Sequence, residues 1–144
     1  MRSYASWSAI CSNENVEGER RILMVDDKVT LCFAMCEYFK LYSYQVDCAH
    51  NVDDATTRLI ASRYAVMITD LALGGTHELN GFQVIQIARE RYPEMRIIVL
   101  TAYGTAESES AARDLGVSAF LHKPSPLSEV ARIVFELAVD RLKD

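Results

Sequence analysis

Short apolar runs alternate with segments of helical periodicity along most of this chain. Five runs predict strands buried on both faces, at 21–25, 45–49, 65–69, 96–101 and 119–122, of which the second is the weakest. Five segments between and after them predict helices, at about 28–41, 52–62, 82–91, 105–114 and 126–143. A strand followed each time by a helix predicts an α/β fold, a doubly wound parallel sheet with helices on both faces.

Local signals mark several helix ends. Asn51 is a good N-cap for the second helix, and Tyr92–Pro93 closes the third. Gly116 follows the fourth helix, as glycine often does. Pro126 is expected in the first turn of the last helix.

The first 19 residues differ from the rest because they are polar and aperiodic. We expect them to form a flexible N-terminal arm, with residues 20–144 as one domain. A length of 144 residues suits a single core. The arm has no sustained apolar run, so it does not predict a secretory signal, and a cytoplasmic location is expected.

Charge excludes some classes of partner. The formal net charge is −5 and the pI about 5.2, so no basic field favours direct nucleic-acid or membrane binding. No apolar stretch approaches the ~20 residues that cross a bilayer.

Cysteine and histidine carry little of the predicted chemistry. The cysteines are Cys11, Cys32, Cys36 and Cys48, and without a signal peptide they are expected to be free thiols. Cys32 and Cys36 lie one helical turn apart, which would allow a metal pair, but their apolar helix favours packing. The histidines are His50, His77 and His122, and their spacing does not suggest a metal site.

Chemistry gathers where the predicted strands end. Asp26 and Asp27 follow the first strand, Asp70 the third, Thr101 ends the fourth, and Lys123 follows the fifth. In a doubly wound sheet these carboxyl ends share one edge. Three carboxylates there repel one another unless a cation neutralises them, and Mg²⁺, with Mn²⁺ as an alternative, is the usual choice for phosphate chemistry. Asp70 would then be a carboxylate nucleophile that needs no general base.

These residues resemble the receiver domain of two-component response regulators over roughly residues 20–143. The matching segments are ILMVDD (22–27), VMITDLAL (66–73), NGFQVI (80–85), IIVLTAYG (97–104) and ARDLGVSAFLHKP (112–124). The resemblance implies a flavodoxin-like sheet of strand order 2-1-3-4-5 with five helices. It also implies a phosphoacceptor signalling domain, not an enzyme beyond its own phosphorylation and dephosphorylation.

The resemblance assigns a metal site position by position. Asp70 looks like the phosphorylated aspartate, and Asp27 like a direct magnesium ligand. Asp26 resembles the acidic partner that acts largely through metal-bound water. Ala72 would offer its backbone carbonyl to the metal.

Further positions resemble the switch and phosphate-binding residues of the family. Thr101 and Lys123 look like the switch hydroxyl and the phosphate-binding ammonium, and Phe120 like the switch aromatic. The Lys123–Pro124 bond is expected to be cis on the same ground.

The resemblance also implies partners. A sensor histidine kinase or a histidine phosphotransfer protein would supply the phosphoryl group. The face made by the fourth helix, fifth strand and fifth helix would bind partners or a second copy. No output domain follows the last predicted helix, so the chain is expected to be a stand-alone receiver or a fragment of a longer regulator or hybrid kinase.

One loop departs from the family pattern. Proline is common four residues after the acceptor, where this chain has Gly74, and the segment 74–80 looks a few residues longer than usual. The change is expected to affect docking and the lifetime of the phosphoryl group.

Other interpretations remain open from the residues alone. Asp26 and Asp27 would serve as capping residues, and Thr101 as an ordinary β-branched strand residue, if each stood by itself. An aspartyl-phosphate phosphohydrolase is a second function, disfavoured because such enzymes usually carry an acid where this chain has Ala72. A non-phosphorylated binding module on the same fold is a third.

Overall fold

The computed structural model describes residues 20–74 and 78–143, within which ten elements alternate strictly between strand and helix. The strands are β1 (Arg21–Val25), β2 (Gln45–Ala49), β3 (Val66–Thr69), β4 (Arg96–Thr101) and β5 (Ala119–His122). The helices are α2 (Val29–Lys40), α3 (Val52–Ala61), α4 (Gly81–Arg91), α5 (Ala106–Asp114) and α6 (Leu127–Lys143). The predicted elements are confirmed, and no predicted end differs by more than one residue from the observed one. The predicted N-terminal arm lies outside the described residues.

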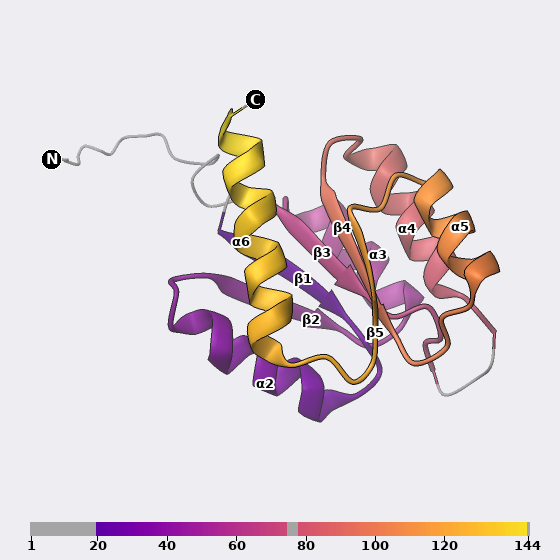
Figure 1. Cartoon of the computed structure of the whole chain (residues 1–144), viewed down its shortest axis with the longest axis horizontal. Helices are drawn as coiled ribbons and strands as arrows, with labels where there is room; N and C mark the ends of the chain where they lie inside the picture. The colour runs from indigo at the N-terminus through magenta and orange to yellow at the C-terminus, as the bar shows by residue number, and fades with distance from the viewer. Residues whose placement is uncertain (1–19, 75–77, 144) are drawn as a thin grey trace, which may run out of the picture.

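The five strands form one parallel sheet in the order β2-β1-β3-β4-β5, as predicted. Helices α2 and α6 cover one face, and α3, α4 and α5 cover the other (Figure 1). Both faces of the central strands are therefore buried, which explains their continuous apolar sequences.

The core is two apolar layers separated by the sheet, and alternate residues of each strand contribute to opposite layers. In β1, Leu23 packs with α3, α4 and α5, whereas Met24 packs with α2 and α6. Phe39 of α2 is fully buried and lies edge-on to Phe135 of α6, with ring centroids 6.1 Å apart. These contacts hold α2, whose N-terminus begins just after the predicted acidic pair.

Capping contacts explain where the helices begin and end. The Asn51 side chain accepts a hydrogen bond from the Asp54 N–H at 2.8 Å, as an N-cap should. Gly116 has φ +80° just past α5, which suits glycine at a helix C-terminus. Helix α6 begins at Leu127, one residue after the predicted start at Pro126. The Pro126 carbonyl accepts hydrogen bonds from the N–H groups of Glu129 and Val130, so this residue takes part in the first turn of hydrogen bonds.

The described part of the chain contains no helix that is both long and apolar enough to span a membrane.

Candidate functional site

The sheet places two of the predicted acidic residues side by side. The Asp70 N–H donates to the Val25 carbonyl at 2.9 Å, and the Asp26 N–H donates to the Ala49 carbonyl at 3.0 Å. Each bond extends a parallel ladder one residue beyond the end of its strand. The main chain at Asp26 and Asp70 is therefore as well positioned as the strands themselves.

Three carboxylates meet at this edge, as the sequence predicted. Carboxylate oxygens of Asp26, Asp27 and Asp70 all lie within 4.8 Å of one another. Asp26 is fully buried and Asp70 nearly so, whereas Asp27 is half-buried. Like charges this close destabilise one another, and oxygen ligands in such a group suit a hard divalent cation.

Lys123 lies between two of these carboxylates. Its Nζ is 2.7 Å from Asp26 Oδ2 and 2.9 Å from Asp70 Oδ2. Burial alone would lower the pKa of Lys123, but the two carboxylates outweigh it and raise this pKa, so the ammonium stays charged. With all groups ionised, three carboxylates and one ammonium carry a formal charge of −2. That charge matches one divalent cation.

Burial in the cluster disfavours the ionised form of Asp26. Burial raises its pKa above the ordinary value, and the hydrogen bonds from Lys123 Nζ and the Lys28 N–H only partly offset this rise. The neutral form is thus favoured more than in water. A bound cation would favour the ionised form again.

Hydrogen bonds to both oxygens orient the Asp70 carboxylate. Oδ1 accepts from the N–H groups of Leu71 at 2.7 Å and Ala72 at 3.3 Å, while Oδ2 accepts from Lys123. The side chain is held at the sheet edge in a single orientation. Among the described contacts, Asp26 and Asp70 each accept hydrogen bonds from the Lys123 ammonium and from the main chain, and Asp70 accepts from two main-chain N–H groups.

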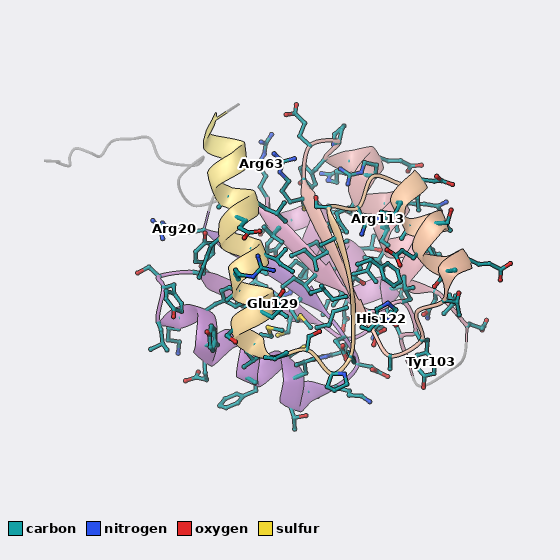
Figure 2. The ribbon with its side chains drawn as sticks, viewed as in Figure 1. Arg20, Arg63, Tyr103, Arg113, His122 and Glu129 are labelled. Carbon is teal, nitrogen blue, oxygen red and sulfur yellow. The ribbon has the colours of Figure 1, made fainter. Side chains whose placement is uncertain are left out.

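Thr101 and Phe120 lie on the neighbouring strands. Thr101 is fully buried at the end of β4, and its hydroxyl oxygen accepts a hydrogen bond from the Tyr103 N–H at 3.2 Å. The Phe120 side chain is buried too, beside His122, with ring centroids 5.5 Å apart. Tyr103 and His122 lie toward the end of the molecule where β4 and β5 end (Figure 2). The Lys123–Pro124 bond is cis, as predicted.

The loop after Asp70 contains a residue that sequence reasoning overlooked. The Asn80 side chain accepts from the Leu73 N–H at 2.8 Å and donates to the Leu73 carbonyl at 3.1 Å, which closes the loop into a ring. The Gly81 N–H also donates to the Leu71 carbonyl at 2.8 Å. The Asn80–Gly81 pair just before a helix was the available signal, since asparagine readily replaces a main-chain partner in turns.

The histidines serve no common site among the described residues. His50, the residue after β2, lies with its Nδ1 2.9 Å from the Asp26 carbonyl oxygen and so hydrogen-bonds to the main chain of the acidic pair. His122 lies beside Phe120 on β5. His77 falls outside the described residues.

Comparison with known proteins identifies the family. The sequence model of the response regulator receiver domain matches residues 22–135. RegA, a photosynthetic apparatus regulatory protein of Cereibacter sphaeroides, is 30% identical over 112 residues, which cover 78% of this chain and 59% of RegA. This chain belongs to the response regulator receiver domain family. The chain spans about three fifths of the length of RegA.

Solved structures agree on the fold. A CheY-like receiver domain from Methanospirillum hungatei superposes with a TM-score of 0.80 at 20% identity, covering 86% of this chain and 97% of that one. A response regulator from Burkholderia pseudomallei was solved with a phosphorylated aspartic acid and a calcium ion. It superposes with a TM-score of 0.74 at 24% identity, covering 86% of this chain and 71% of that one. The resemblance stated from the sequence is confirmed, and a two-component signalling role follows from family membership.

Proposed function

We propose that this receiver domain accepts a phosphoryl group on Asp70 with a divalent cation, Mg²⁺ first and Mn²⁺ second, as cofactor. The observation that carries the proposal is the meeting of three carboxylates and the Lys123 ammonium within one buried edge. The carboxylates of Asp26, Asp27 and Asp70, with the Ala72 carbonyl, would hold the cation. Oxygen donors suit this ion, and the formal charge of −2 on these groups would balance one divalent cation. When bound, it would offset the charge on the phosphoryl oxygens.

Transfer needs little from the protein beyond position and charge. An Asp70 carboxylate oxygen attacks phosphorus, and the bond from phosphorus to the donor's imidazole nitrogen breaks, with its electron pair leaving on that nitrogen. A carboxylate is itself a nucleophile, so no general base is needed. The bonds from Leu71 and Ala72 aim the carboxylate. The domain thus promotes its own phosphorylation without acting on a separate substrate.

Lys123 and Thr101 would bind the transferred group. Lys123 Nζ now bridges two carboxylates, and a phosphoryl group on Asp70 offers it oxygens in the same place. The Thr101 hydroxyl would donate to a phosphoryl oxygen from the adjacent strand end. Its movement would be accompanied by a change at Phe120, whose ring is buried in the present state.

The donor would be a sensor histidine kinase or a histidine phosphotransfer protein, and the protein would act in the cytoplasm. We propose the α5–β5–α6 face as the output surface and as a dimer interface. A comparable receiver domain of NtrC4 has been solved as a beryllofluoride-activated dimer. On this face Ala112, Val130 and Val134 are buried in the core, so exposed residues such as Ala106 and Ala111 would make the contact.

Intact-mass measurement tests the acceptor directly. The protein is incubated with Mg²⁺ and acetyl phosphate or phosphoramidate, beside Asp70→Asn and the matched control Asp53→Asn, an exposed aspartate on α3. One phosphate adduct is expected in the native protein and in Asp53→Asn, and none in Asp70→Asn. An adduct that persists in Asp70→Asn would place the acceptor elsewhere. The absence of any adduct, even with a phosphohistidine donor, would refute the proposal.

A further inference from the structure

Three thiols form a row between α2 and β2, on the face of the sheet covered by α2 and α6. Cys36 Sγ on α2 and Cys48 Sγ on β2 are 3.8 Å apart, and Cys36 Sγ is also 3.5 Å from the Val46 carbonyl oxygen. The Cys32 thiol lies 3.7 Å from the Asp26 carbonyl oxygen and is close enough to Cys48 to raise the pKa of that thiol. Cys36 and Cys48 are half-buried, whereas Cys32 is almost completely buried.

We propose that Cys36 and Cys48 are a site of oxidative modification, where a disulfide bond joins α2 to β2. A disulfide has an S–S length of about 2.05 Å, so the two sulfurs must approach by less than 2 Å. Neither element needs a new neighbour, because α2 already packs beside β2 through Cys36 and Val46.

The chemistry requires an oxidant, and a small-molecule disulfide such as oxidised glutathione supplies it. The Cys36 thiolate attacks one glutathione sulfur, forming a mixed disulfide and releasing one glutathione thiolate, which takes a proton. The Cys48 thiol loses its proton and attacks the Cys36 sulfur, which releases the second glutathione. Two protein thiols are oxidised to one disulfide, and one glutathione disulfide is reduced to two thiols.

Accessibility selects the pair among the three thiols. Cys32 is 2% exposed, so an external oxidant reaches Cys36 or Cys48 first. Burial raises the pKa of Cys36 to about 11, and the neighbouring Cys32 thiol together with burial raises the pKa of Cys48. Both thiols are therefore protonated at neutral pH, and exchange is slow. The rate should therefore rise with pH, about tenfold per unit well below this pKa, because only the thiolate attacks.

The Cys36–Cys48 disulfide bond would lie on a helix that begins beside the acidic site. Helix α2 begins two residues after Asp27, and its Cys32 thiol contacts the Asp26 main chain. A disulfide that pins the middle of α2 to β2 is expected to limit the movement of this segment.

Mass spectrometry of the 144-residue chain tests the proposal in a Cys11→Ser background, since Cys11 lies outside the described residues. After oxidised glutathione is added at pH 8.5, we expect a mass loss of about 2 Da and a cross-linked peptide pair containing Cys36 and Cys48. Reduction with a phosphine should reverse both. Cys36→Ser and Cys48→Ser should each stop at one glutathione adduct, whereas Cys32→Ser should still form the bond.

Three outcomes would overturn the proposal. The first is a cross-link between Cys32 and Cys48, and the second is a loss of 2 Da that persists in Cys36→Ser. The third is the absence of any cross-link while the native protein, still folded by circular dichroism, gains only glutathione adducts.

Discussion

Lys123 is the residue on which the charge balance of the acidic edge depends. Without a cation it is the cationic partner of Asp26 and Asp70 in the described contacts, at 2.7 and 2.9 Å. It also repels an arriving metal ion, because both cations share the same carboxylates. One side chain therefore stabilises the metal-free site and, in our proposal, binds the phosphoryl group.

Replacing Lys123 with alanine should separate these two roles. Phosphorylation of Asp70 by acetyl phosphate is expected to slow at least ~10-fold, because a charge-assisted contact to the phosphoryl oxygens is lost. Mg²⁺ affinity is expected to stay the same or to rise about 3-fold, because a competing cation has gone. Calorimetric titration and phosphorylation rates measure the two effects. Lys40→Ala, which alters an exposed lysine beside Glu37, is the control and should change neither.

A proportional fall in metal affinity and phosphorylation rate in Lys123→Ala would contradict this account. It would mean that Lys123 holds the carboxylates in place for the metal.

At the scale of elements, Asp47 in the middle of β2 joins this strand to β1 and to Tyr64, which precedes β3. Its Oδ2 accepts from Arg21 at 2.7 Å and from Tyr64 at 2.6 Å. Burial alone would raise the pKa of Asp47, but these hydrogen bonds outweigh it and lower this pKa. The ionised form is thus favoured by folding, and its contribution is present above the unfolded-state pKa of about 3.8 and lost as pH falls below it.

Asp47→Asn should therefore lose stability only where Asp47 is ionised. At pH 7 we expect the free energy of unfolding to fall by about 1.5–3 kcal/mol, the range for hydrogen bonds to a charged group. The difference from the native protein should shrink toward pH 3. Urea denaturation between pH 3 and 7, in EDTA, measures it. Tyr64→Phe removes one of the hydrogen bonds to Asp47 and should lose less stability than Asp47→Asn. If the loss in Asp47→Asn did not depend on pH, the ionised carboxylate would not be its cause.

The loop between β3 and α4 shows why the family's usual proline is missing. Gly74 has φ +80°, which proline cannot adopt because its ring holds φ near −65°. A Cβ at Gly74 would meet nothing within 4 Å, so only its backbone conformation requires glycine. Gly81 is the reverse case: a Cβ there would lie 2.1 Å from the Asp70 carbonyl oxygen.

These two glycines should respond differently to alanine. Gly81→Ala must displace the main chain of Asp70, so we expect a loss of about 2–3 kcal/mol of stability and slower phosphorylation. Gly74→Ala should cost about 1–2 kcal/mol through its positive φ, with phosphorylation unchanged. Denaturation and acetyl phosphate kinetics on both variants test the distinction. Equal rates in the two variants would show that the Gly81 contact does not position Asp70.

At the scale of the whole molecule, the sequence predicted the sheet and the residues at its edge. Buried parallel strands have continuous apolar sequences, and their carboxyl ends must share one edge, so Asp26, Asp70 and Lys123 could be grouped without coordinates. The Cys36–Cys48 approach and the His50–Asp26 contact could not be predicted. They depend on the pairing of Met24 with Cys48 between β1 and β2, and on how α2 lies over β2. Hydrophobic periodicity does not specify either.

The metal should be visible in the stability of the whole domain. A cation that binds only the folded state stabilises it, by about 2.7 kcal/mol at 100 times its Kd. Asp27→Asn removes a proposed ligand that is half-buried and outside the Lys123 ion pairs. The variant should fold about as well as the native protein in EDTA but lose the gain from Mg²⁺. Urea denaturation with MgCl₂, against KCl at the same ionic strength, measures this gain, and Asp53→Asn should retain it. If Asp27→Asn gained as much as the native protein, the effect of Mg²⁺ would be general screening and not binding at the acidic edge.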